Sequence, residues 1–146
     1  MQTRTNPIIS VLAILPSPQD RTSLQEIFSH SKWNLRMAEA LYPARTLIDE
    51  LGAGVVISDT RLPDGCWQDV LLETQCRPVA PVLIVVSRLA DESLWAEVRN
   101  LGGYDVLATP LEPREVIRSV SLAWRHWQDR LAVKVLKAGS SAWPDS

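Results

Sequence analysis

Short apolar runs alternate along the chain with stretches of helical periodicity. The runs at residues 8–15, 54–58 and 81–86 are mostly β-branched and aliphatic, which predicts strands buried on both faces of a parallel sheet. Residues 33–38 place apolar side chains at every second position, as a half-buried edge strand does. A fifth, shorter strand is predicted at residues 104–107.

Five helices are predicted between and after these strands, from capping residues and from apolar positions three and four apart. Their predicted starts are Pro18, Pro43, the turn before Trp67, Asp91 or Ser93, and Pro113. The first is expected to end near Ser31, and glycines at residues 52 and 102–103 end the second and the fourth. The last is expected to run to about Lys137, where the Gly-Ser-Ser at residues 139–141 breaks it.

This alternation of strands and helices predicts an α/β fold, a parallel sheet with helices on both faces. The edge character of residues 33–38 and the burial of residues 54–58 and 81–86 favour the flavodoxin-like strand order 2-1-3-4-5. We divide the chain into an N-terminal tail at residues 1–7, a domain at residues 8–125, and a helix extension with a tail at residues 126–146.

Composition and charge narrow the class of protein. The 146 residues are 46% hydrophobic and 22% charged, which suits one domain with a sizeable core. A net charge of -2 gives no general attraction to nucleic acid or to anionic lipid. The first apolar run lacks a signal-peptide cleavage site, and no run reaches the roughly 18 apolar residues of a membrane span. Cys66 and Cys76 show neither metal-ligand spacing nor a disulfide framework. We therefore expect a soluble, cytoplasmic protein that binds neither nucleic acid nor membrane.

One acid stands at the end of the central predicted strand. Asp59 follows the apolar run at residues 54–58, and the chain then turns at Pro63 and Gly65. Open α/β sheets hold their ligands at the carboxyl ends of the strands. Asp59 is therefore a candidate nucleophile or metal ligand.

The order and spacing of several pieces resemble the receiver domain of bacterial two-component response regulators, over roughly residues 8–125. The pieces are Asp59 with Leu62-Pro63-Asp64-Gly65, Ser87 after the fourth strand, Gly102-Gly103-Tyr104-Asp105 before the fifth, and Thr109-Pro110 where the family has Lys-Pro. The resemblance implies phosphoryl transfer from a histidine kinase to Asp59. It also implies Mg²⁺ held beside Asp59 by two acids at the end of strand one, and a lysine after strand five.

The chain departs from the family at the residues that carry charge. The two acidic positions read as Leu15 and Pro16, which have no side-chain oxygen, and the lysine position reads as Thr109. Losing a metal ion and a cation removes several kcal/mol of transition-state stabilisation. A loss of about 4 kcal/mol already lowers the rate about a thousandfold. We therefore expect no Mg²⁺ site, no cofactor and no catalytic residue, and Asp59 is a phospho-acceptor only if ordinary phosphotransfer occurs at all. Asp20 is expected to point to solvent, and Asp64 to bind no metal.

The switch residues of the family are only partly present. Ser87 keeps the hydroxyl that, by the resemblance, bonds the phosphoryl group. The aromatic position on the fifth strand reads as Val106, and Tyr104 lies two residues earlier, on the same face by strand parity. Thr109 completes the set of switch-like positions with a second hydroxyl.

The last helix carries an apolar stripe beyond the length that a sheet edge needs. Its members at helical spacing are Val116, Ile117, Val120, Trp124, Trp127, Leu131 and Val135. We expect the first three to pack on the sheet and Trp124, Trp127 and Leu131 to form an interface. The alternative is that the tryptophans pack on helices of their own domain. His126 has no matched acid or cysteine nearby and is not expected to be a catalytic base.

These observations favour a divergent pseudo-receiver, a protein-interaction module that is not an enzyme and works without phosphorylation. Its partner would be a kinase, an output protein, or a second copy bound through the last helix. One alternative is a working single-domain response regulator phosphorylated on Asp59. Another is a flavodoxin-like nucleotide or flavin binder, which would need a glycine-rich loop after strand one, where the chain reads Pro16-Ser17-Pro18.

Overall fold

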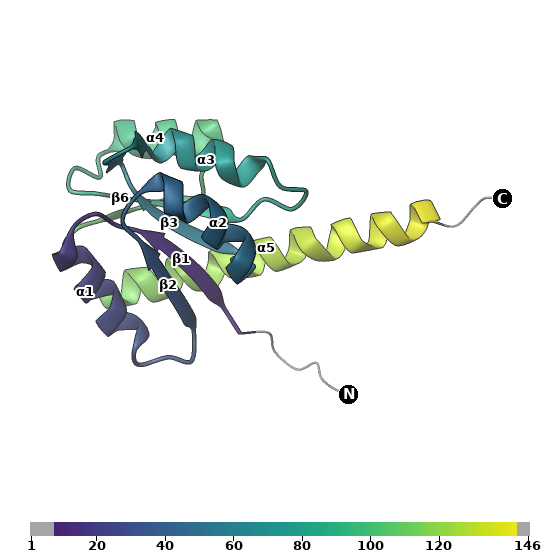
Figure 1. Cartoon of the computed structure of the whole chain (residues 1–146), viewed down its shortest axis with the longest axis horizontal. Helices are drawn as coiled ribbons and strands as arrows, with labels where there is room; N and C mark the ends of the chain where they lie inside the picture. The colour runs from purple at the N-terminus through teal and green to yellow at the C-terminus, as the bar shows by residue number, and fades with distance from the viewer. Residues whose placement is uncertain (1–7, 143–146) are drawn as a thin grey trace.

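The computed structural model describes residues 8–142, so the predicted tail at residues 1–7 and the last residues, 143–146, lie outside the described part. Its centre is a five-stranded sheet in the order β2-β1-β3-β6-β7, with every neighbouring pair parallel (Figure 1). The strands are β1 Ser10–Ile14, β2 Asn34–Ala38, β3 Val55–Asp59, β6 Val82–Ser87 and β7 Asp105–Ala108. The predicted fold class and strand order are confirmed.

The helices are α1 Pro18–Phe28, α2 Leu41–Leu51, α3 Trp67–Gln75, α4 Glu92–Leu101 and α5 Pro113–Ala142. Helix α2 begins two residues before Pro43, and a proline is tolerated there because backbone N–H groups of the first turn have no helical partner. Helix α1 ends at Phe28, earlier than the predicted end near Ser31.

A small antiparallel hairpin stands where the sequence predicted only a loop. Strands β4 Arg61–Leu62 and β5 Gly65–Cys66 pair with each other directly after β3. Each strand has two residues, too few for an alternating pattern to appear in the sequence. Leu62 is buried, so the hairpin lies against the domain rather than extending from it.

Two layers of helices cover the two faces of the sheet. Helices α1 and α5 cover one face through a cluster that includes Leu24, Phe28 and Val120, and we call them the α1/α5 layer. Helices α2, α3 and α4 cover the other face through a second cluster that includes Ile48, Val70 and Val98. We call these three the α2/α3/α4 layer.

Helix α5 is the longest element, with 30 residues and therefore a length of about 45 Å. Its first part packs on the sheet, and its far end projects beyond the rest of the domain (Figure 1). The predicted stop near Lys137 is wrong, because the helix continues to Ala142. Glycine and serine lower helix propensity without blocking helical geometry. The predicted domain division after residue 125 falls inside this helix.

Trp124 and Trp127 pack within the domain. Trp124 is 7% exposed, Trp127 is partly buried, and their ring centroids are 4.9 Å apart. Both rings lie on Gly54, where a Cβ atom would come within 2.6 Å of each. The structure thus corrects the expectation that Trp124 projects toward a partner. Because Gly54, just before β3, has no side chain, both indoles fit against the backbone there. The part of α5 that packs within the domain is therefore longer than expected.

The far end of α5 is different in character. Leu131 is half-buried, whereas Val135 is 62% and Leu136 is 71% exposed. No helix within residues 8–142 combines the length and the apolar character needed to cross a membrane.

Candidate functional site

Four chain segments meet at the carboxyl edge of the sheet, because the strands of this sheet are parallel. They are the turn after β1, the end of β3, the end of β6 and the turn after β7. Backbone hydrogen bonds connect three of them, from the Thr60 N–H to the Val86 carbonyl (3.2 Å) and from the Thr109 N–H to the Ser87 carbonyl (3.1 Å). The structure thus brings Asp59, Ser87 and Thr109 to one edge, as the sequence predicted.

Asp59 ends β3 with a half-buried side chain. Its carboxylate accepts a hydrogen bond from the Thr60 hydroxyl (3.2 Å) and a long one from the Arg61 N–H (3.4 Å). Both donors belong to the next two residues of the chain. The carboxylate is therefore held by its own loop, and part of it remains accessible from solvent.

The turn after β1 is held by a cation, Arg21. Leu15 is fully buried and Pro16 is half-buried. The Arg21 guanidinium donates to the carbonyls of both residues, at 2.8 Å each, and lies 3.8 Å from the Glu39 carboxylate. Sequence reasoning gave no role to Arg21. Its place one turn after the helix N-cap at Ser17 was the signal that could have revealed this contact.

Asp20 faces the site, which corrects the expectation that it points to solvent. It lies in the first turn of α1 and is half-buried. Burial raises the pKa of its carboxyl above the ordinary value, and the negative charge of Asp59 adds to this, while the Arg88 guanidinium partly offsets both. The pKa shift arises because α1 starts directly beside the carboxyl edge, so its first turn places a second carboxylate near Asp59.

Ser87 and Thr109 keep their hydroxyls at the edge. The Ser87 hydroxyl oxygen accepts a hydrogen bond from the Leu89 N–H (3.0 Å), which organises the loop after β6. Ser87 and Thr109 are both half-buried. Neither brings a positive charge to Asp59. The Arg88 guanidinium lies near Asp20.

Tyr104 and Val106 lie on opposite faces, so the predicted shared face is wrong. Val106 packs in the α2/α3/α4 layer, and Tyr104 packs in the α1/α5 layer. Tyr104 precedes β7, whose first residue is Asp105, and strand parity does not extend to a residue outside the strand. The Tyr104 ring lies 5.7 Å from the His126 ring on α5.

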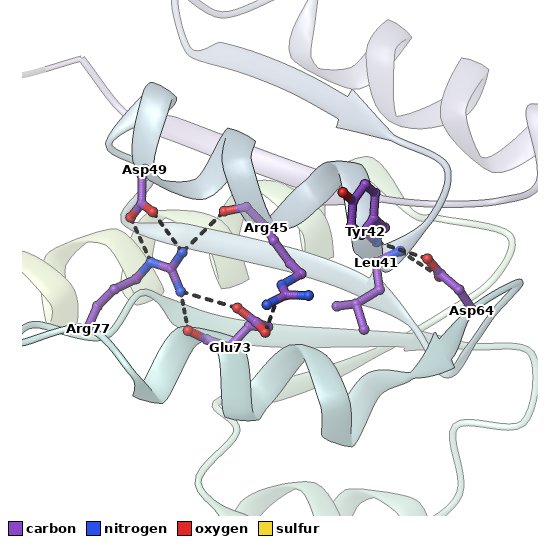
Figure 2. Close-up of polar contacts among 7 residues, drawn as sticks. All are labelled: Leu41, Tyr42, Arg45, Asp49, Asp64, Glu73 and Arg77. Atoms are coloured by element: carbon purple, nitrogen blue, oxygen red, sulfur yellow. Dashed lines mark hydrogen bonds and ion pairs between the residues drawn. The ribbon is translucent and has the colours of Figure 1, made fainter.

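Asp64 has a structural role away from Asp59. Its two carboxylate oxygens accept hydrogen bonds from the N–H groups of Leu41 (2.7 Å) and Tyr42 (2.9 Å), as Figure 2 shows. These two N–H groups belong to the first turn of α2, which has no side-chain cap of its own. They lower the pKa of the Asp64 carboxyl below its ordinary value. Asp64 therefore caps α2 from the hairpin, a contact between residues far apart in the sequence.

Solved structures of receiver domains share this fold. The signal receiver domain of an HD domain-containing protein from Pseudomonas fluorescens Pf-5 matches with a TM-score of 0.79 at 20% identity, over 90% of this chain and 97% of the other. The chemotaxis response regulator CheY4 of Vibrio cholerae matches with a TM-score of 0.72 at 14% identity, over 80% and 99%. A beryllofluoride-activated NtrC4 receiver domain dimer matches with a TM-score of 0.72 at 21% identity, over 81% and 98%.

The comparisons define a class of fold. No protein-family model matches the sequence, and comparison with curated proteins gave no match. At the identities above, the structural matches establish that the chain has the fold of response-regulator receiver domains. The function of the carboxyl edge must be inferred from the residues that this chain places there.

Proposed function

We propose that this chain is a pseudo-receiver, a protein-interaction module of bacterial two-component signalling that works without phosphorylation. The observation that carries the proposal is the turn after β1. There Leu15 is buried, and the Arg21 guanidinium binds the carbonyls of Leu15 and Pro16. A cation and two residues without side-chain oxygens take the place of two metal-binding carboxylates.

The donor set at this edge does not fit Mg²⁺, which takes oxygen ligands and usually one or two carboxylates. Within residues 8–142 no group of three or more His, Cys, Asp or Glu side chains could hold a metal ion. Asp20 and Asp59 lie near each other at this edge, and the Arg88 guanidinium lies near Asp20. The proposal therefore includes no resident metal. It also expects no cofactor, no enzymatic activity and a cytoplasmic location.

Incubation with acetyl phosphate and Mg²⁺ tests the proposal by intact-protein mass spectrometry. We expect the wild-type chain and Asp59→Asn to remain equally unmodified. The double variant Pro16→Asp with Thr109→Lys restores one acid and the cation at two half-buried positions. In this variant we expect measurable Mg²⁺-dependent phosphate uptake. Circular dichroism checks that this variant is folded. Stoichiometric acid-labile phosphate on Asp59 of the wild type would contradict the proposal.

A working single-domain response regulator is the second candidate, favoured by the retained Asp59 and Ser87. A kinase or another partner would then complete the site and transfer a phosphoryl group to the half-buried Asp59 carboxylate. A kinase-dependent change in partner affinity that disappears in Asp59→Ala would support this candidate over the first. A flavodoxin-like ligand binder is the third candidate, and thermal-shift measurements with flavins and nucleotides test it.

The far end of α5 is the surface through which we propose self-association or binding of a kinase or output protein. Val135 and Leu136 are 62% and 71% exposed on a helix that projects from the domain. Such a short helical end is marginal in water unless something packs on its apolar side. Sedimentation velocity at rising concentration tests the homodimer, with Val135→Glu as the variant. A strictly monomeric profile for the wild type would rule out the homodimer and leave a different partner.

A further inference from the structure

Two neighbouring cavities lie at the opposite edge of the sheet from Asp59. Their volumes are about 330 and 380 Å³, and both are lined by His126 and Arg130 of α5. The first is lined by the ends of α3 and α4, by residues at the amino ends of β6 and β7, and by α5. The second lies between α5 and the loop at Pro78 and Val79. We call the two cavities together the basic trough, and each of them a part of it.

Positive charge dominates the walls of the basic trough. Its lining residues with a charged or imidazole side chain are Arg99, His126, Asp129, Arg130, Lys134 and Lys137. No acidic side chain lines the first part, and Asp129 is the single acid in the second. Within residues 8–142, neither Arg130 nor Lys134 makes an ion pair, and both are exposed. Even without Lys137, the cations Arg99, Arg130 and Lys134 against Asp129 leave this trough positive in a chain whose net charge is -2.

Two of the basic side chains are held in place. The Arg99 guanidinium donates to the Tyr104 carbonyl (2.9 Å) and lies 5.5 Å from the centroid of the Trp95 ring. The His126 ring packs on the Tyr104 ring. Side chains that are ordered before binding lose less conformational entropy on binding. The first part of the trough is therefore partly pre-organised.

Apolar residues also line the trough. Leu71, Pro81 and Val82 line the first part, and Pro78, Val79 and Val133 line the second. Val133 is 50% exposed. An occupant that matches both the apolar and the basic lining residues needs apolar side chains flanked by negative charge.

We propose that the basic trough docks an acidic, partly apolar segment of a partner protein. The inference rests on the proposed function, since it states the chemistry of the partner that such an interaction module would bind. Charge complementarity selects this occupant, because a second copy would bring the cations around Arg130 and Lys134 against the same cations. A flat bilayer would meet the rim of the concave trough and leave its apolar lining residues uncovered.

Fluorescence anisotropy with a short synthetic peptide tests the proposal. The peptide carries leucines at helical spacing with glutamates between them, and a second peptide replaces every glutamate by lysine. We expect the glutamate peptide to bind the full chain and its affinity to fall as salt is raised. We expect the lysine peptide to bind at least about tenfold more weakly, because its charges oppose those of the trough.

A charge-reversed variant locates the binding. Arg130→Glu with Lys134→Glu should lower the affinity for the glutamate peptide by at least about tenfold. The matched control, Arg114→Glu with Arg118→Glu, makes the same change in net charge at exposed positions near the start of α5. We expect it to change the affinity by less than about threefold, because charges beyond a Debye length are largely screened.

Several outcomes would overturn the inference. They are no binding of the glutamate peptide, an equal loss in the control variant, or tighter binding to anionic phospholipid vesicles or duplex DNA than to the peptide. Phosphate uptake on Asp59 would instead overturn the proposed function. Because the peptide measurement contains no phosphoryl donor, its result stands independently of that outcome.

Discussion

The two helical layers are held on the sheet by different means. In the α1/α5 layer the contacts are apolar and aromatic, with the indoles of Trp124 and Trp127 stacked over Gly54. The α2/α3/α4 layer has an apolar core as well, but exposed polar groups connect its helices (Figure 2). There the Arg77 guanidinium binds the Asp49 carboxylate at 2.8 Å and the Glu73 carbonyl.

Because of this difference, the contributions of the two layers to stability should depend differently on pH and salt. Burial of apolar area depends little on pH or salt, whereas exposed ion pairs contribute little and are screened. The layer built on apolar burial is also the one that carries the projecting end of α5. A helix whose end projects beyond the domain needs a firm attachment, and the indoles of Trp124 and Trp127 supply it.

The largest effect should come from removing the buried indole. Trp124→Ala is expected to lower the free energy of unfolding by about 3–5 kcal/mol, because it leaves a cavity between α5 and the sheet. Urea denaturation followed by circular dichroism measures it. Trp95→Ala is the control, since Trp95 is 49% exposed and loses mainly its contact with Arg99. A loss below about 1 kcal/mol in Trp124→Ala would show that the layer is not held by this packing.

Gly54→Ala should produce the next largest effect. A Cβ atom at this position would lie 2.6 Å from both indole rings, so α5 has to shift. We expect a loss of about 1–3 kcal/mol in the same denaturation experiment, as for other overpacked cores. Combining Gly54→Ala with Trp127→Leu tests the cause, because the smaller side chain removes one of the two clashes and leaves the one with Trp124. Losses that simply add in the double variant would contradict direct contact between the methyl group and Trp127.

Sequence reasoning reached the features that depend on local periodicity. The alternation at residues 33–38 identified the edge strand, and the sequence alone showed that Leu15 and Pro16 bring no side-chain oxygen to the turn after β1. It could not identify which distant groups meet. Asp64 caps α2 at Leu41 and Tyr42, which lie 23 and 22 residues away in the chain. The indoles of Trp124 and Trp127 pack on Gly54, which is also distant in the sequence. Periodicity predicts which side chains are buried, but it does not predict which residues they contact.

In the α2/α3/α4 layer, the cap of α2 should depend on pH. The pKa of Asp64 is lowered in the folded chain, so its contribution is present above the ordinary value of 3.8 and is lost as pH falls through the folded pKa. Asp64→Asn resembles the protonated acid. We expect its Tm to be a few degrees below wild type at neutral pH and equal to it in strong acid. Glu50→Gln, whose exposed carboxylate makes no hydrogen bond within residues 8–142, is the control. A difference that persists in strong acid would mean that charge is not what Asp64 supplies.

The smallest effect should come from the Arg77–Asp49 pair. The hydrogen bonds from Arg77 lower the pKa of Asp49, yet the Asp49 side chain is 69% exposed, so solvent screens most of the interaction. A double-mutant cycle with Arg77→Ala and Asp49→Ala should give a coupling of about 0.2–1 kcal/mol at neutral pH. The coupling should shrink in molar salt and vanish as Asp49 is protonated. A coupling as large as the effect of Trp124→Ala would remove the contrast between the layers, because exposed charges would then hold α3 as firmly as buried indoles hold α5.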